Sequence, residues 1–85
     1  MANKRVLSRV QVTQRIGLSS SEIYRRMAEG LFPPQVHVGC SRVVWIEDEI
    51  DGWFALRIAN ASDDEIKVAI SQMIEARKLN YRFAV

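Results

Sequence analysis

The chain has 85 residues, with 12 Lys and Arg, 10 Asp and Glu, and a single cysteine, Cys40. This length accommodates one small core, so a separate catalytic domain is excluded. One cysteine cannot form an intramolecular disulfide or a multi-cysteine zinc site, and it fits a reducing cytoplasm. No apolar run is long enough to span a membrane or to serve as a signal peptide, so we expect a cytoplasmic protein without membrane contact.

The charge is distributed unevenly along the chain. Residues 1–46 contain seven Lys and Arg and two Asp and Glu, whereas residues 47–85 contain five basic and eight acidic residues. A basic segment joined to an acidic one predicts a module that faces phosphates and a separate surface for other contacts.

Two short helices are predicted near the start of the chain. Ser8 with Gln11, and Ser19 with Glu22, have the spacing of a capping box, in which the two side chains satisfy backbone N–H groups of the first turn. Gly17 ends the first helix, because glycine adopts the left-handed conformation without strain. One interpretation of these two helices is an ordinary αα-hairpin whose charged side chains are only solvated. Two helices joined by a tight turn also form a helix-turn-helix, whose second helix enters the major groove of DNA.

The second helix has an outward face that suits a nucleic-acid groove. Ile23 and Met27 share its apolar face, which leaves Ser21 and Arg25 pointing away from the core. A bidentate contact from Arg to guanine is the commonest specific contact to a base edge. Arg25 is therefore predicted to read a base.

The residues around Arg25 each have two interpretations. Arg26 lies on the flank of the helix, where it meets either phosphate or solvent. Tyr24 either contacts the DNA backbone or lies half-buried beside the core. Ser20 and Ser21 either donate to phosphates at the positive helix N-terminus or are simply favourable first-turn residues.

A β-hairpin is predicted after the second helix, which ends before Pro33 and Pro34 because proline cannot continue it. Residues 35–38 alternate with period two, residues 39–41 form a turn, and residues 42–46 are β-branched and aromatic. A hairpin that follows two helices is typical of a wing.

A third helix is predicted to begin within the acidic cluster at positions 47 to 51, because acidic residues favour a helix N-terminus. Trp45, at the end of the hairpin, and Trp53 are expected in the core. The apolar stripe of this helix comprises Ile50, Trp53, Phe54 and Ile58.

The chain has no convincing catalytic or metal-binding constellation. His37 is the only histidine and Cys40 the only cysteine, so neither a metal site nor a Cys-His-carboxylate triad is supported. Consecutive acids at a helix start point in different directions and suit the helix dipole. We therefore expect no enzyme, no catalytic residue, no metal and no cofactor.

A fourth helix is predicted after Ser62, which forms a third capping box with Glu65. Its narrow stripe either folds back on the core or pairs with a second copy of the chain, and we favour self-association. The domain division is then a winged helix-turn-helix over residues 1–59 and a C-terminal helical extension over residues 60–85. The stripe comprises Ile66, Ala69, Ile70, Met73 and Ile74.

Several short motifs together resemble the AlpA family of phage and prophage regulators, which belongs with the excisionase and MerR-like winged helix-turn-helix proteins. The resemblance implies a small cytoplasmic DNA-binding protein that activates transcription, often of an integrase gene, or directs excision by binding and bending DNA beside a recombinase. It covers about residues 6 to 58, through Gly17-Leu18-Ser19, Ile23-Tyr24-Arg25, Glu29-Gly30, Phe32-Pro33, Val38-Gly39, Arg42, Val44, Trp45, Glu49-Ile50 and Trp53.

The resemblance also implies which residues contact DNA and where this chain departs from the family. Position 20, often basic in the family, is Ser here, and Cys40 and Ser41 stand where a Gly or another small residue often makes the wing turn. The helix after Ser62 lies outside the resemblance. The family's DNA-contacting positions correspond to Ser20, Ser21, Tyr24 and Arg25 on the second helix and Arg42 in the wing.

These observations predict a mainly α fold with a small β-hairpin, a winged helix-turn-helix plus a C-terminal amphipathic helix. The expected function is sequence-specific binding of double-stranded DNA, in regulation of transcription or as an excisionase in DNA recombination. The expected partners are double-stranded DNA, a second copy through the C-terminal helix, and integrase or RNA polymerase. The alternative is a protein-interaction module in which the third and fourth helices bind a partner and DNA contact is weak.

Overall fold

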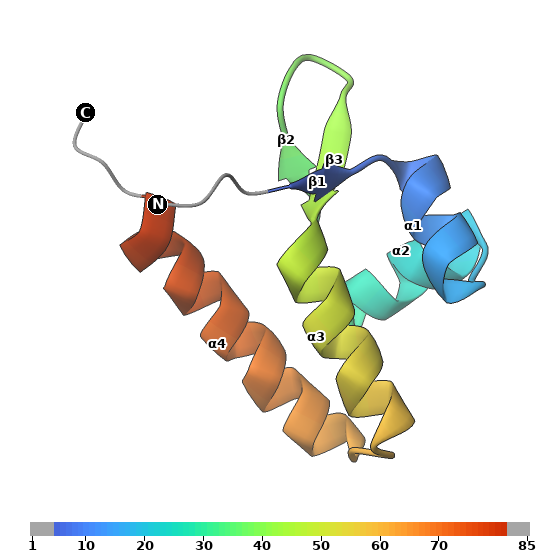
Figure 1. The fold of residues 1–85 in the computed structure, drawn as a ribbon, viewed down its shortest axis with the longest axis vertical. Helices are drawn as coiled ribbons and strands as arrows, with labels where there is room; N and C mark the ends of the chain where they lie inside the picture. The colour runs from blue at the N-terminus through green and yellow to red at the C-terminus, as the bar shows by residue number, and fades with distance from the viewer. Residues whose placement is uncertain (1–4, 82–85) are drawn as a thin grey trace.

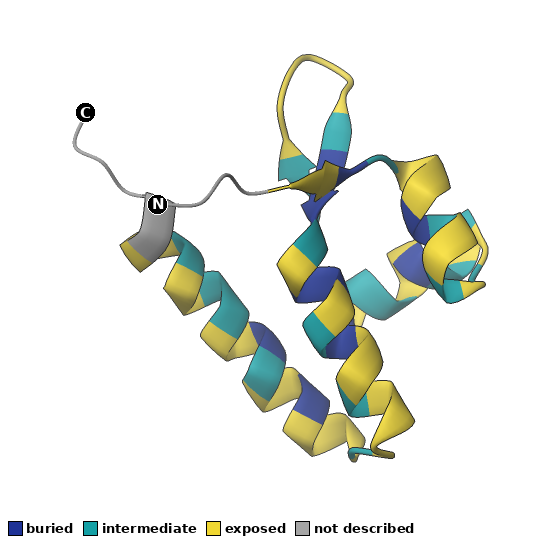
Figure 2. Ribbon diagram, viewed as in Figure 1, coloured by how far each residue is buried: buried dark blue, intermediate teal, exposed yellow. Residues whose placement is uncertain are grey.

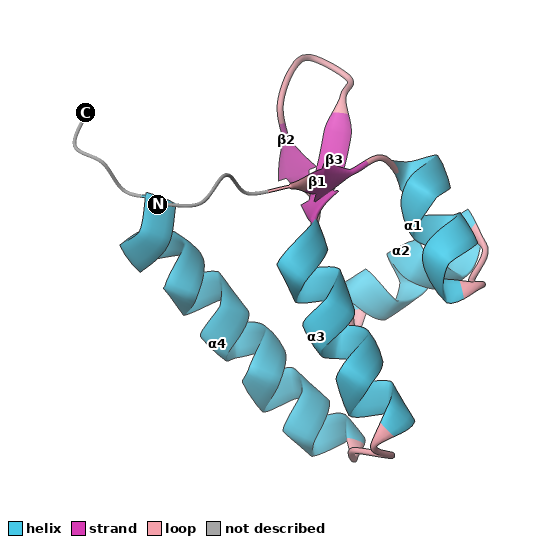
Figure 3. Cartoon of the chain, viewed as in Figure 1, coloured by secondary structure: helices cyan, strands magenta, loops and turns pink. Residues whose placement is uncertain are grey.

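The computed structural model describes residues 5–81, which form four helices and a three-stranded antiparallel sheet (Figures 1 and 3). The predicted fold class is confirmed, because two helices precede a hairpin and two more helices follow it. The elements in chain order are β1 (Val6–Leu7), α1 (Arg9–Ile16), α2 (Ser20–Ala28), β2 (Val36–His37), β3 (Val43–Ile46), α3 (Glu47–Ile58) and α4 (Asp63–Tyr81).

The predicted capping boxes of the first and last helices are confirmed. Ser8 Oγ accepts a hydrogen bond from the backbone N–H of Gln11 at 3.2 Å, and Gln11 Oε1 accepts one from the N–H of Ser8 at 2.8 Å. The same two bonds join Ser62 and Glu65 at the start of α4. Each box satisfies two N–H groups that the helix itself leaves without partners, so both starts are determined locally.

The predicted box at the start of α2 is only half present. Ser19 Oγ accepts from the N–H of Glu22 at 3.2 Å, as an N-cap does. The carboxylate of Glu22 does not reach back to Ser19; its Oε1 accepts instead from Arg25 and Arg26. Charge-assisted hydrogen bonds from a guanidinium are stronger than a hydrogen bond from a neutral N–H. The carboxylate of Glu22 therefore binds the two arginines and not the backbone N–H of Ser19.

Residues in the left-handed conformation end the first three helices. Gly17, at φ 76°, ends α1 and leaves a three-residue turn before α2. At the end of α2, Gly30 also has φ 76°, and the N–H of Leu31 donates to the carbonyl of Arg26 at 2.9 Å, which is a Schellman motif. Asn60, at φ 62°, has the same role after α3.

Replacing Gly30 with alanine is expected to lower the free energy of unfolding by about 1 kcal/mol, because a Cβ destabilises the left-handed conformation. Gly39→Ala is the matched control: φ of Gly39 is not positive, and its added Cβ would meet only Arg42 Cβ, at 3.8 Å. Urea denaturation of the two variants measures the difference. Equal effects would show that the turn after α2 does not need its left-handed residue.

Strand β3 lies at the centre of the sheet, between β1 and β2. Val36 pairs with Val44 and His37 with Val43 in the predicted hairpin, so the wing is confirmed. Strand β1, which pairs Leu7 with Trp45, was not predicted. Two residues are too few to show the period of a strand, so the sequence carries no signal for β1.

The core is built on two tryptophans, as predicted. Trp45 is fully buried and Trp53 is 3% exposed. The indole N–H of Trp45 donates to the carbonyl of Pro33 at 3.1 Å, and that of Trp53 donates to the carbonyl of Leu31 at 2.8 Å. The ring of Phe32 lies edge-on to that of Trp53, with ring centroids 4.7 Å apart. The two rings therefore hold the segment that leads from α2 into the wing.

The predicted apolar stripe of α3 is wrong at two positions. Ile50 and Trp53 are buried, but Phe54 is 39% and Ile58 73% exposed (Figure 2). Helix α3 is covered by β3 and by α4, so its buried surface is wider than a single stripe and is displaced from positions 54 and 58. Phe54 and Ile58 lie on the same face of α3 as Glu47 and Asp51, whose carboxylates bind Arg15.

The stripe of α4 is buried within its own chain. Ile66 is 1% and Ile70 5% exposed, and both belong to the core cluster that contains Trp45. Met73 and Ile74 pack against the same cluster, because α4 runs back alongside α3 (Figures 1 and 2). Of the two alternatives, folding back on the core is confirmed, and self-association through this stripe is wrong.

A buried ion pair, missed by sequence analysis, fastens α4 to α3. Arg77 Nε and Nη2 donate to Glu49 Oε2 and Oε1 at 2.8 and 2.6 Å. Arg77 Nη2 also donates to the carbonyl of Pro34 at 2.6 Å. The Glu49 side chain is only 10% exposed, so this pair connects both C-terminal helices to the base of the wing.

Candidate nucleic-acid interface

Helix α2 presents the predicted outward face. Ser21, Tyr24 and Arg25 are exposed, whereas Ile23, on the opposite side, is completely buried and Met27 packs against the core. The other two predicted residues of this helix, Ser20 and Arg26, lie at the margin of the face, each partly buried. The spacing of the apolar residues thus orients the polar ones outward.

The guanidinium of Arg25 is held between two carboxylates. Its Nη2 donates to Glu22 Oε1, and its Nη1 lies 3.8 Å from Glu29 Oε2. Arg26 Nε also donates to Glu22 Oε1, at 3.4 Å, and its side chain is 24% exposed. These ion pairs were not predicted, although Glu and Arg three or four residues apart on a helix have the spacing that favours them.

The side chain of Tyr24 connects α2 to the wing. Its ring lies edge-on to the ring of Trp45, with centroids 6.3 Å apart, and the residue is 37% exposed. One edge of Tyr24 therefore packs on the core while the rest faces solvent, and its contact with the DNA backbone stays a prediction. This contact holds the outward face of α2 against the strand that carries the wing.

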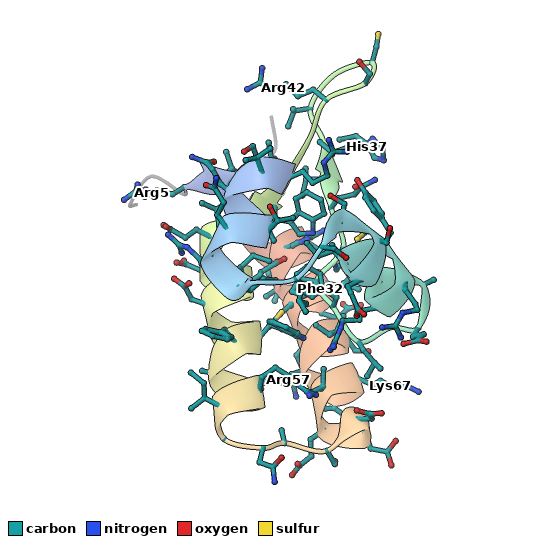
Figure 4. All side chains as sticks on the ribbon, turned by 90° about the vertical axis from the view of Figure 1, so that its right-hand side faces the viewer. Arg5, Phe32, His37, Arg42, Arg57 and Lys67 are labelled. Carbon is teal, nitrogen blue, oxygen red and sulfur yellow. The ribbon has the colours of Figure 1, made fainter. Side chains whose placement is uncertain are left out.

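The wing presents a second basic site. Arg42 is exposed and has no ion pair with any residue from 5 to 81. It lies closer to the wing tip than His37, the last residue of β2 (Figure 4). The N–H of Val38 donates to the carbonyl of Arg42 at 3.0 Å and closes the loop. None of the residues 39–41 has a positive φ, so Cys40 and Ser41 form the turn without a left-handed residue.

Two other basic residues of the N-terminal half, Arg5 and Arg15, are partly neutralised by α3. Glu47 Oε2 accepts from Arg15 Nη2 at 2.8 Å and Asp51 Oδ1 from Arg15 Nη1 at 2.9 Å, while Arg5 Nε lies 3.5 Å from Glu47 Oε1. The bond to Glu47, followed by that to Asp51, raises the pKa of Arg15 against the opposing effect of desolvation. The basic and acidic halves therefore meet along this edge, and among residues 5–46 the exposed cations without an ion pair to another described residue are Arg42 on the wing and Arg9 on α1.

The described residues were predicted to contain no metal site, and two of the candidate ligands, His37 and Cys40, lie on the wing. Within residues 5–81, no group of three or more His, Cys, Asp or Glu side chains could hold a metal ion. His37 and Cys40 are both exposed. No helix in this range combines the length and the apolar character needed to cross a membrane.

The chain is similar to known proteins over about two thirds of its length. Residues 5–58 match the family described as Prophage CP4-57 regulatory protein (AlpA). The chain is also 41% identical, over 59 residues, to the uncharacterized protein ORF88 of Enterobacteria phage P4, and the match covers 69% of this chain and 67% of that protein. No solved structure matches the chain. The match spans the helix-turn-helix, the wing and α3, and the chain therefore belongs to the AlpA family of prophage regulatory proteins.

Proposed function

We propose that the protein binds double-stranded DNA in a sequence-specific manner and thereby regulates a phage or prophage. The observation that carries this proposal is the exposed set Ser21, Tyr24 and Arg25 on α2, joined through Tyr24 to the strand of a wing whose Arg42 has no ion pair within residues 5–81. A helix of this kind fits the major groove, and a wing cation fits an adjacent phosphate.

Each predicted residue has a role in this complex. Arg25 reads a guanine edge, and Arg26 and Arg42 neutralise phosphates. Tyr24 contacts the backbone with its exposed edge. Ser20 and Ser21 donate to a phosphate at the N-terminus of α2, where the helix dipole is positive.

Two regulatory outcomes are compatible with such a complex. The protein either activates transcription, with RNA polymerase as a partner, or directs excision beside an integrase. Both outcomes begin with recognition of a DNA site, so the proposal rests on the same residues in each case. DNA contact is assigned to the residues before position 60, and α4 supports them by packing on α3.

Selection from a pool of DNA duplexes with a randomised centre tests the proposal. The protein should enrich a defined site, and its affinity should fall steeply as salt rises from 50 to 200 mM, because bound phosphates release counterions. The alternative, a protein-interaction module on α3 and α4, predicts no enriched site. Absence of enrichment at low salt would overturn the proposal.

Replacing Arg42 with alanine is expected to weaken binding to the selected duplex and to a scrambled duplex by the same factor. Loss of one phosphate contact should reduce the slope of log affinity against log salt by about one unit. Fluorescence anisotropy at several salt concentrations measures both quantities. An unchanged slope would remove Arg42 from the interface, and an altered base preference would place the wing in a groove.

A further inference from the structure

We propose that Glu22 is a specificity-determining residue of the DNA interface, a role that rests on the proposed function. Its carboxylate holds Arg25 on the surface of α2 and repels phosphates, so that complexes without a suitable base edge are disfavoured. The proposal concerns an acidic residue that lies among the predicted DNA-contacting residues of α2.

Glu22 lies beside both cations of α2. It lies in the first turn of α2, one turn before Arg25, and its side chain is 40% exposed. Its Oε1 accepts hydrogen bonds from both Arg25 and Arg26. One carboxylate oxygen therefore sets the direction of the two cations that α2 offers to DNA.

The acidic and basic residues of α2 and its C-cap are equal in number. Arg25 and Arg26 are matched by Glu22 and Glu29, so the segment from 20 to 29 has no net charge. The exposed cation of the wing, Arg42, has no such partner within the described residues. Nonspecific attraction to phosphates then comes from the wing rather than from α2.

Base pairs differ in the donors and acceptors that they present to Arg25 and Glu22. Guanine presents two acceptors to an arginine, and the N4 amino group of its paired cytosine donates to a carboxylate. A G·C pair facing α2 thus provides partners for both Arg25 and Glu22. A wrong pair, or a phosphate alone, gives the carboxylate no donor from the DNA and places it close to like charge, which is discrimination by repulsion.

The test compares Glu22→Gln with Glu65→Gln. Glutamine retains an acceptor for Arg25 but loses the negative charge. Glu65 occupies the same third position of α4 that Glu22 occupies in α2, is exposed, and closes a box that glutamine also closes at Gln11. The two variants have the same net charge, so they differ only in where the charge is removed.

The readouts are affinities for the duplex enriched by the unmodified protein and for a scrambled duplex. Glu22→Gln should bind the scrambled duplex roughly tenfold more tightly than Glu65→Gln does, with a salt slope steeper by about one unit. The ratio of specific to nonspecific affinity should fall by a similar factor. Glu22→Asp, which keeps the charge, should preserve most of the ratio, and thermal melting should be the same for all three variants.

The outcomes separate this inference from the proposed function. If the unmodified protein enriches a site but Glu22→Gln and Glu65→Gln have the same affinity ratio and salt slope, Glu22 has no role in specificity while sequence-specific binding stands. If the unmodified protein enriches no site, both proposals fall. A ratio that falls equally in Glu22→Asp and Glu22→Gln would also overturn the role of the charge.

Discussion

Replacing Arg77 with methionine is expected to lower the free energy of unfolding by about 3 to 5 kcal/mol, because it leaves the carboxylate of Glu49 without its cation in a largely buried position. The Arg77 side chain is 20% and the Glu49 side chain 10% exposed, so little water reaches the pair. The carbonyl of Pro34 loses its donor as well. Urea denaturation followed by circular dichroism measures the change.

Two further variants make this expectation specific to the buried pair. Lys78→Met removes the neighbouring cation, whose Nζ lies 3.4 Å from Glu75 Oε2, with both side chains about 70% exposed. This replacement should change the free energy of unfolding by less than about 1 kcal/mol. The double replacement of Glu49 by leucine and Arg77 by methionine should recover most of the lost stability, because no charge is then left buried. A small effect of Arg77→Met alone would show that Glu49 is hydrated in solution.

The ion pair also explains why α4 matters to a domain whose DNA-facing elements precede it. Arg77 bonds Pro34, which lies between α2 and the wing, while Trp45 and Trp53 bond the carbonyls on either side of Phe32. Three side chains from β3, α3 and α4 therefore anchor one short segment. The direction of the wing relative to α2 depends on that segment.

Local signals made most of the fold predictable. The serine caps, the left-handed glycines and the alternation of the hairpin each act within a few residues, so the sequence contains them completely. The short strand β1 has no such signal, because its two residues become a strand only by pairing with β3. The stripe of α3 failed for a related reason, since the covering of that helix by α4 is a tertiary contact.

The candidate site was predictable in its residues but not in their partners. Helical spacing placed Ser21 and Arg25 on the outward face, and both are exposed in the structure. The neutralisation of Arg25 by Glu22 also follows from spacing, but the capping preference of Glu22 pointed to a different bond. The pairing of Glu49 with Arg77 joins residues 28 positions apart, which no periodicity reveals.

Replacing Arg25 with alanine should weaken binding to the selected duplex by about 1 to 3 kcal/mol and leave the scrambled duplex much less affected, because a base contact is lost. The fold should remain intact, since the side chain is 56% exposed and its ion pairs lie on the surface.

Arg57→Ala is the control for charge, because Arg57 is an exposed cation on α3 away from the wing (Figure 4). It should weaken both duplexes slightly and equally through the long-range field of the protein. Anisotropy titrations with both duplexes, together with thermal melting, separate recognition from stability. If Arg25→Ala and Arg57→Ala have the same effect on both duplexes, α2 does not read bases through Arg25, and recognition must lie in the wing or in the shape of the DNA.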